Sequence, residues 1–407
     1  MSSPSLPSAF RRLAWSSLAA LVADQLGLAA APIVAVLVLG AGVGETGLLQ
    51  TAQTLPFLLL AIPAGLLADR IRRRRLMAAA EAVRAGSLIA ILILAAGGHL
   101  TLSLFAVLGF LGASGTVAYT VTAPSLVPAL VPRESLAAAN GRLELTRSAA
   151  FIAGPALGGA LVGWIGGTPA FAVAAILSVI AVILLAGLDE PSRPTLPPRH
   201  PLKDIADGAR FVATHRLLSP ILVTAIVFNI AFFMLQAVYV PYAVHRLGLG
   251  ASGVGITLAA YGAGMMSGAL LAPRITRVLP FGTVVAIGPI TGLAAALAMA
   301  LTIWVPSPLL AALGYFLIGV GPVLWQISTT TLRQLVTPER LIGRVSSMIT
   351  VASYGSRPIG AALGALIGGG FGAETCLIVA AGGFVIQMTF ILASPVVRLA
   401  HPPEAVA

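Results

Sequence analysis

Long apolar stretches alternate with short polar connections along the whole chain, and this pattern limits the folds open to it. The apolar stretches lie at about 13–39, 46–68, 76–96, 101–127, 144–165, 169–187, 217–243, 252–272, 281–304, 307–329, 345–369 and 374–394. Each is close to the roughly 20 residues that a helix needs to cross about 30 Å of hydrocarbon. Because lipid offers the backbone no hydrogen bonds, each stretch is expected to be helical. The pattern predicts an all-α membrane protein with twelve transmembrane helices.

The composition excludes an ordinary soluble protein. Charged residues make up 9% of the 407 residues, against about 25% in a typical soluble domain. The net charge of +11 does not indicate a nucleic-acid partner, because the basic residues lie in clusters between apolar stretches. A lipid bilayer is the environment that this composition requires.

The basic residues lie in every second connection between the apolar stretches. They are Arg70 and Arg72–Arg75 after the second span, Arg133 and Arg142 after the fourth, Arg274 and Arg277 after the eighth, and Arg333, Arg340 and Arg344 after the tenth. The other connections contain one basic residue, Arg246. Basic loops stay in the cytoplasm. We therefore expect a multi-pass protein of a bacterial-type cytoplasmic (inner) membrane, with both termini in the cytoplasm.

A polar, proline-rich stretch divides the chain near its middle. We expect an N-terminal six-helix half over 1–187, a cytoplasmic linker over 188–216 with a short surface helix at 203–211, and a C-terminal six-helix half over 217–407. Gly159-Ala160-Leu161 and Gly364-Ala365-Leu366 lie 205 residues apart. Similar charged turns precede both, so duplication is favoured over chance similarity of Gly/Ala-rich helices. Repeated halves are typical of secondary transporters.

The connection after the second span contains the most specific motif. It reads Gly65-Leu66-Leu67-Ala68-Asp69-Arg70-Ile71-Arg72-Arg73-Arg74, and it resembles the G-x-L-a-D-R-x-G-R-[RK] signature of the major facilitator superfamily. It departs from that signature at Arg72, where the family usually has glycine. The whole chain resembles the twelve-span branch that includes macrolide and enterobactin exporters. The resemblance implies two six-helix pseudo-repeats and secondary transport. The cytoplasmic loop motif and gate consist of Gly65, Asp69, Arg70, Arg73 and Arg74, in which the glycine allows close helix contact. We hypothesise that Asp69 helps to close the cytoplasmic side by pairing with a neighbouring helix.

A second motif of the resembled family lies in the fifth span. Gly154, Pro155, Gly158 and Gly159 look like the drug-antiporter motif, in which glycines let a partner helix approach closely. Ordinary small-residue packing explains them equally well. The arginine that many proton-driven antiporters carry in span 4 has no match, because 102–131 contains no basic residue.

Charged residues inside spans are costly and usually functional. Glu81 and Arg84 are three residues apart, as are Glu144 and Arg147, so each pair can be neutralised on one helix face. Both pairs are predicted near the cytoplasmic end, in a structural or gating role.

Asp24 and Arg357 lie near the middle of their spans, without an opposite charge within one turn. Ser17, Ala20, Gly27 and Ala31 share the helix face of Asp24, and we expect this face of small residues to point into the bundle. Asp24 is the first candidate for proton or cation binding, and a buried structural ion pair is the alternative. We hypothesise that the two residues meet in one transport state, with Arg147 as a competing partner.

Other polar side chains lie in spans expected to line a cavity. Together with Asp24 and Arg357, the candidates for proton or substrate binding are Gln25, Asn229, Gln236, Tyr239 and Gln326. Aromatic neighbours would make the cavity apolar with a few hydrogen-bonding points, which suits amphiphilic organic solutes. Individually, such residues more often serve helix packing.

These observations predict a secondary transporter that exports small amphiphilic molecules by alternating access, with protons as the coupling ion. An importer or a lipid flippase of the same fold is the alternative, and a non-transporting receptor or scaffold is the alternative from another class. We expect no enzyme activity, because no Ser/His/Asp or His/Glu set and no phosphate-binding G-x-x-x-x-G-K-[ST] sequence is present. No cofactor, metal or nucleic-acid partner is expected, and the protein is predicted to be a monomer.

Overall fold

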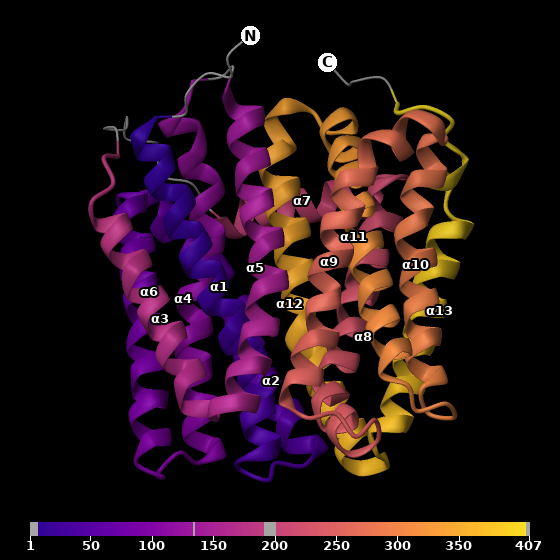
Figure 1. Cartoon of the computed structure of the whole chain (residues 1–407). Helices are drawn as coiled ribbons and strands as arrows, with labels where there is room; N and C mark the ends of the chain where they lie inside the picture. The colour runs from indigo at the N-terminus through magenta and orange to yellow at the C-terminus, as the bar shows by residue number, and fades with distance from the viewer. Residues whose placement is uncertain (1–6, 133–134, 191–200, 404–407) are drawn as a thin grey trace. The chain divides into compact units, whose positions relative to one another are not determined.

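The chain is helical, as expected, with no strand in the part that the computed structural model describes, which covers residues 7–132, 135–190 and 201–403. Side chains are also not described at 69, 124, 125, 137, 201–205, 339 and 340. The helices, drawn in Figure 1, are α1(Ser8–Leu37), α2(Val43–Arg70), α3(Arg73–Ala96), α4(Leu102–Leu130), α5(Leu136–Ile165), α6(Gly167–Ala186), α7(Pro201–Thr214), α8(Leu218–His245), α9(Ala251–Val278), α10(Phe281–Leu301), α11(Pro308–Val336), α12(Glu339–Phe371), α13(Ala373–Ala393) and the 3₁₀ turn η2(Pro395–Arg398).

Eleven helices of the described chain are long and apolar enough to cross a membrane. The helix α12 is outside that group although it has 33 residues. Its hydropathy is lowered by Arg357 near its middle and by the glycines of its second half. Together with α12, the eleven helices are consistent with the twelve predicted spans, and α7 is the short helix expected in the linker.

Several helices continue past the apolar stretch from which they were predicted. The helix α5 begins at Leu136 instead of about 144, α12 begins at Glu339 instead of about 345, and α11 ends at Val336 instead of about 329. The added turns contain alanine, arginine, leucine and glutamine, which are good helix formers. Hydropathy therefore located the part of each helix that fits in hydrocarbon, whereas backbone hydrogen bonding sets the full length.

The structure divides into two compact units that are not continuous in sequence. Unit 1 contains Met1–Ala41, Ala52–Pro198 and Gly250–Ala259, and unit 2 contains Gly42–Thr51, Arg199–Leu249 and Ala260–Ala407. The first residues of α2 thus belong to unit 2, and those of α9 to unit 1. The predicted boundaries at 187 and 217 stay predictions, and 191–200 of the linker lies outside the described residues.

The two units repeat one packing scheme. In unit 1, α1 packs against α5 and α6, and α3 packs against α4 and α6. In unit 2, α8 packs against α12 and α13, and α10 packs against α11 and α13. The tight turns recur as well: Gly166 before α6 and Gly372 before α13 both have positive φ, at 96° and 89°, a conformation that favours glycine. They lie 206 residues apart, close to the spacing of the sequence repeat.

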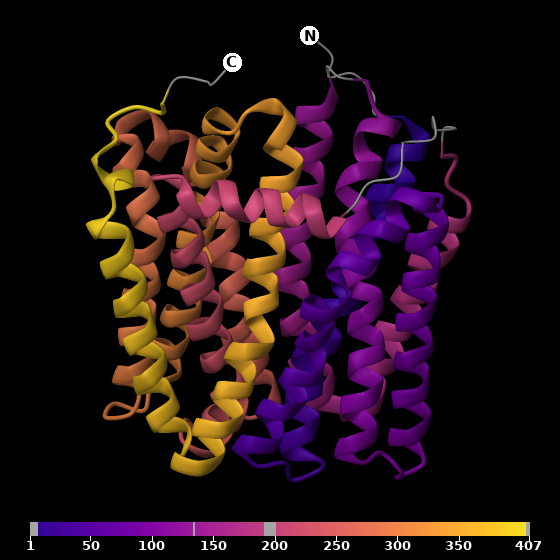
Figure 2. The ribbon, with the colours of Figure 1, turned by 180° about the vertical axis from the view of Figure 1, so that it is seen from behind.

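The short helix α7 lies crosswise to α12 in unit 2 (Figure 2). Arg344 Nη1 of α12 donates to Asp207 Oδ2 of α7 at 2.7 Å. Gly208 permits the close approach, because a methyl group there would lie 2.6 Å from the Arg344 carbonyl oxygen. On the other face of α7, Val212 is fully buried in a core cluster with Leu218, Leu332 and Val345.

Large apolar side chains cover much of the outer surface. Examples are Leu48, Ile93, Val107, Ile183 and Leu366, each at least 58% exposed. Exposed apolar surface on this scale is unfavourable in water and favourable in lipid. Trp164 at the end of α5 and Trp304 after α10 are 80% and 69% exposed, and tryptophan is enriched where a helix leaves the hydrocarbon.

Candidate functional site

Asp24 lies on a face of α1 that is buried in unit 1. Ser17, Ala20 and Ala31 of the same face are at most 5% exposed, which confirms the prediction that this face points into the bundle. Alanines at 19, 20, 23 and 29–31 give α1 a narrow surface. Neighbouring helices therefore approach α1 closely, and their side chains reach Asp24.

The counter-charge of Asp24 comes from α3. Arg84 Nη1 donates to Asp24 Oδ1 at 2.9 Å, and Arg84 Nη2 donates to Glu81 Oε1. Thr116 of α4 donates to Asp24 Oδ1 at 2.8 Å, and Gln25 Nε2 donates to Asp24 Oδ2 at 3.3 Å. The side chains of Glu81, Arg84 and Asp24 are 0%, 6% and 13% exposed. Two carboxyl groups thus share one guanidinium in a buried site, and we call these three residues the ion group.

Arg84 pairs with Glu81, as their spacing predicted, and it also pairs with Asp24 of α1, which fits the alternative of a buried structural ion pair. Charge neighbours on one helix can be read from i,i+3 spacing, but a contact between α1 and α3 cannot. The predicted pair of Asp24 with Arg357 joins residues of different units and stays a prediction.

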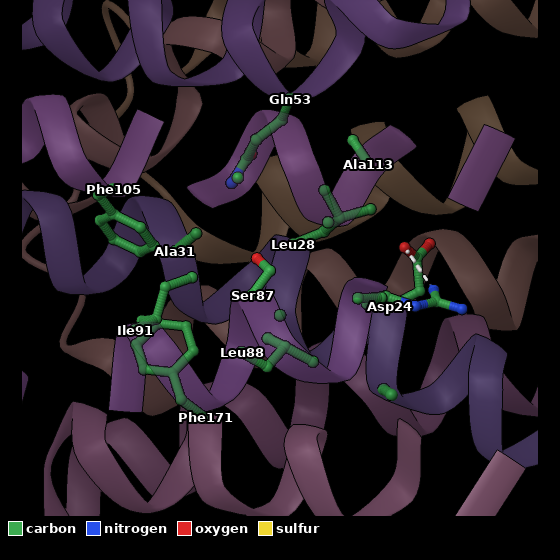
Figure 3. A pocket seen from close by; sticks show the side chains of 15 residues that line it. Asp24, Leu28, Ala31, Gln53, Ser87, Leu88, Ile91, Phe105, Ala113 and Phe171 are labelled. Carbon is green, nitrogen blue, oxygen red and sulfur yellow. Dashed lines mark hydrogen bonds and ion pairs between the residues drawn. The ribbon is translucent and has the colours of Figure 1, made fainter. Parts of the chain in front are cut away.

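A cavity extends from the ion group through the interior of unit 1. Its water-accessible volume is about 60 Å³, and its lining includes Asp24, Arg84, Ser87, Gln53, Phe105 and Phe171. Figure 3 shows Asp24 at one side of the cavity, Phe105 and Phe171 at the other, and Ser87 between them. Ser87 and Gln53 were not among the predicted site residues, because an isolated serine or glutamine in an apolar span gives no signal in a single sequence.

Arg357 lies in unit 2 among aromatic side chains. Its Nε donates to Asn229 Oδ1 of α8 at 3.2 Å, and its guanidinium carbon lies 3.9 Å from the Tyr354 ring centre and 5.2 Å from that of Phe233. Cation–π contacts of this kind stabilise a guanidinium away from water. The structure therefore brings together two of the predicted candidates, Arg357 and Asn229.

The remaining polar candidates of unit 2 have separate surroundings. Tyr315 of α11 donates to Gln236 Oε1 at 2.9 Å, and the ring of Tyr315 meets that of fully buried Tyr239 edge-on, at 4.6 Å between centres. Gln326 is exposed, and its Nε2 donates to Thr330 at 3.3 Å. Gln236 and Tyr239 thus contribute to one packed cluster, which does not include Gln326.

The loop motif is held by a residue outside it. Arg70 is the exposed last residue of α2, and Arg73 and Arg74 begin α3. The backbone amides of Arg73 and Arg74 donate to Glu190 Oε1 and Oε2, each at 3.1 Å. A carboxylate at a helix N-terminus satisfies free N–H groups and complements the helix dipole. Glu190 was missed because its partners lie more than 110 residues earlier in the chain.

Gly65 and Asp69 are the two other residues of the loop motif. A methyl group on Gly65 would lie 3.8 Å from Val121 Cγ1, an ordinary contact. Close packing therefore does not require glycine at this position. The side chain of Asp69 lies outside the described residues, so its predicted role in closing the cytoplasmic side stays a prediction.

The glycines of α5 lie at close helix contacts within unit 1. A methyl group on Gly154 would lie 2.4 Å from Gln25 Cβ, and one on Gly158 would lie 3.1 Å from the Leu26 carbonyl oxygen. Gly159 meets Gly255 of α9 in the same way, at 2.6 Å from its Cα. On the same helix, Glu144 and Arg147 form an ion pair of 3.3 Å that is nearly half exposed.

Comparison with known proteins identifies the family. A profile described as Major Facilitator Superfamily matches residues 10–361. The chain belongs to this superfamily. It is 28% identical over 335 residues to the multidrug efflux pump Tap of Mycobacterium tuberculosis, which covers 78% of the chain and 77% of Tap. It is 28% identical over 309 residues to the enterobactin exporter EntS of Escherichia coli, which covers 74% of the chain and 70% of EntS.

Solved structures share the fold of this member of the superfamily. The POT family transporter PepTSo matches 96% of the chain and 98% of its own length with a TM-score of 0.77 at 12% identity. A bacterial homologue of the iron transporter ferroportin matches 95% of the chain and 98% of its own with a TM-score of 0.73 at 16% identity. These likenesses show the major facilitator fold, and with the family match they make the chain a multi-pass membrane transporter and not an enzyme.

Proposed function

We propose that the chain exports small amphiphilic organic molecules by alternating access, in exchange for protons, across a bacterial cytoplasmic membrane. The observation that carries the proposal is the ion group of unit 1. With Asp24, Glu81 and Arg84 all ionised, this group has a net charge of −1 in a buried site. Tap and EntS, the similar proteins, are named as an efflux pump and an exporter.

The net charge supports a proton as the coupling ion. An uncompensated negative charge inside a bilayer protein is costly. One proton on either carboxyl group makes the ion group neutral, with one carboxylate still paired to Arg84. Protonation therefore changes which bonds Arg84 makes. The contacts of α1 with α3 and α4 thus depend on whether a proton is bound at the ion group. Arg84 of the third span lies beside Asp24. The fourth span contains no basic residue that could take this place.

The side chains of unit 2 support the proposed substrate class. Arg357, Asn229, Tyr354 and Phe233 combine aromatic surface with a few hydrogen-bonding groups. Phe232 stacks on Tyr261 at 5.8 Å between ring centres, which adds further aromatic surface from α9. Such surroundings suit a solute with an apolar body and one or two polar groups.

Everted membrane vesicles test this function, with ethidium and enterobactin as probes. A proton gradient with the vesicle lumen acidic should drive accumulation of at least one probe in exchange for protons that leave the lumen, and an uncoupler should abolish it. Asp24→Asn should remove uphill accumulation and keep probe binding. Asp207→Asn, which breaks an exposed ion pair of α7, is the matched control and should accumulate the probe normally. Accumulation that resists the uncoupler, or that survives in Asp24→Asn, contradicts proton antiport through this site.

A further inference from the structure

The cavity of unit 1 has polar groups that the ion group does not use. Gln53 is 7% exposed, lines the cavity, and its Oε1 has no hydrogen-bond partner among the described residues. A buried polar atom without a partner is costly unless water reaches it. Ser87 donates to the Leu108 carbonyl oxygen at 2.5 Å, so its own oxygen can still accept a bond from the cavity side.

The cavity is large enough for several waters. A site for one water needs about 10–15 Å³ of water-accessible volume, so about 60 Å³ accommodates about four. The lining is apolar except at Asp24, Arg84, Ser87 and Gln53. Water is therefore expected along the line that joins these groups, and a drug-sized molecule does not fit.

The cavity runs along the helices in one direction from the ion group. Its lining extends from Ala23 to Ala31 on α1 and from Arg84 to Ile91 on α3, which is roughly 10–12 Å of helix rise in each case. Both runs lead toward the end of unit 1 at which α1 and α3 finish and α4 and α6 begin. By the distribution of arginines this is the outer side of the membrane.

An aromatic pair lines the cavity at that end. Phe105 of α4 and Phe171 of α6 meet edge-on at 5.6 Å between ring centres, and both are 1% exposed. Both lie near the first turn of their helices, between the cavity and the outer ends.

We propose that this cavity, lined by Asp24, Gln53 and Ser87, holds a water chain that carries protons between the ion group and the outer side of the membrane. The proposal rests on the proposed proton antiport. A hydronium ion in the chain gives one proton to the Asp24 carboxylate and remains as water. The proton returns to water when the carboxyl is ionised again. Rotation of the Phe105–Phe171 pair admits protons, and its packed form blocks them.

The other ionisable groups around Asp24 do not offer a competing route. The neighbouring helices contribute Glu81 and Arg84 from α3, with Arg73–Arg75 at its start, Tyr119 from α4, and Arg142, Glu144 and Arg147 from α5, and α6 contributes none. Tyr119 is hydrogen-bonded to Ser17 at 2.9 Å, and it is not part of the cavity lining. Glu144 and Arg147 are paired with each other. The groups that extend from the ion group toward the outer side are therefore Ser87 and Gln53.

The test measures proton exchange at the carboxyl groups without any substrate. Purified protein in proteoliposomes is transferred from H₂O to D₂O, and the shift of the protonated-carboxyl band is followed by time-resolved infrared spectroscopy. Asp24→Asn assigns the band. Gly27→Val fills the cavity, and Gln53→Leu with Ser87→Ala removes its polar lining. We expect each to slow exchange by about tenfold, which corresponds to about 1.4 kcal/mol of barrier.

Matched controls separate obstruction from damage. Gly86→Val adds the same side chain to α3 at an exposed glycine with open space around it, and it should exchange at the wild-type rate. Wild-type exchange in both cavity variants overturns the water chain and leaves Asp24 as the coupling residue. If no band is lost in Asp24→Asn and uphill export persists, the proposed function itself is wrong. Export driven by a sodium gradient alone overturns the assignment of the cavity to protons.

Discussion

Arg84 is the single positive charge shared by two buried carboxyl groups, so the stability of unit 1 depends on it more than on either acid. Removing one member of a buried ion pair leaves an uncompensated charge, whereas replacing all members with neutral groups is often harmless. The arrangement also explains why Glu81 is tolerated at 0% exposure. Charge and burial at these three positions cannot be changed independently.

Arg84→Met should therefore be strongly destabilising, by about 3–5 kcal/mol. Thermal unfolding in detergent should show a lower Tm, and the triple variant Asp24→Asn, Glu81→Gln, Arg84→Met should recover most of the loss. Arg147→Met, which breaks a half-exposed pair, should lower the Tm little. Equal losses in the single and triple variants would show that the three charges do not act as a group.

The sequence identified Asp24 as a functional candidate because an acid in the middle of an apolar span is expensive and must have a reason. It also identified Glu81 and Arg84 as a pair, from their spacing on one helix. It did not show that Arg84 bonds Asp24, because helix faces can be read from a sequence while the packing of α1 on α3 cannot. Gln53, Ser87 and Thr116 were missed because an isolated polar residue in an apolar span gives no signal until its neighbours on other helices are known.

At the scale of elements, glycines set how closely α1 and α5 pack. Gly154 lies against Gln25 and the backbone amide of Leu26, where a methyl group would be 2.4 Å and 2.9 Å from its neighbours. The motif predicted close packing, and its partner became known only from the fold. Because Asp24 adjoins Gln25, displacing α1 at this contact also moves the ion group.

Gly154→Ala should cost about 1–3 kcal/mol of stability through overpacking, and it should reduce uphill export. Gly141→Ala is the matched control, since Gly141 is an exposed residue of the same helix with open space around it. That change should be neutral or slightly stabilising, because alanine is the better helix former. Thermal unfolding in detergent compares the two, and an equal Tm in both variants would contradict a close α1–α5 contact.

The start of α8 depends on a neutral histidine. His215 Nδ1 accepts hydrogen bonds from the backbone amides of Leu217 and Leu218, at 3.2 Å and 3.3 Å. Burial lowers the pKa of His215 below its ordinary value of 6.5, because the charged form loses hydration. A protonated Nδ1 cannot accept these bonds. The unfolded helix start therefore binds the proton more readily than the folded one.

The sign follows from linkage: the contribution of His215 is present above pH 6.5 and is lost as the pH falls below it, toward the lowered pKa. Hydrogen exchange of the peptide around Leu217 and Leu218, corrected for the intrinsic rate, should show protection that decreases on acidification. His215→Asn keeps an acceptor at this position without titrating, so its protection should not change with pH. Protection that is independent of pH in the wild type would rule out this cap.

At the scale of the whole molecule, the sequence determined the architecture better than the sites. The number of helices follows from the lengths of the apolar stretches, and the family follows from the loop motif. The exchange of the first residues of α2 and α9 between the units could not be predicted, because hydropathy counts spans without showing which of them pack together. The orientation in the membrane and the monomeric state stay predictions.

The orientation is tested by the placement of reporters. Green fluorescent protein fused after Ser192 or at the C-terminus should fluoresce, because both positions are expected in the cytoplasm. Alkaline phosphatase fused after Gly250 should be active, because this position is expected outside. The reason is the clustering of arginine on alternate connections, from Arg70–Arg75 to Arg274 and Arg277, since basic loops are not readily translocated. Gly250 is exposed, with no atom near its Cβ position, so an insertion there should leave the fold intact. Phosphatase activity after Ser192 would place the linker outside. It would also reverse the direction in which the cavity of unit 1 opens, so the proton chain would then face the cytoplasm.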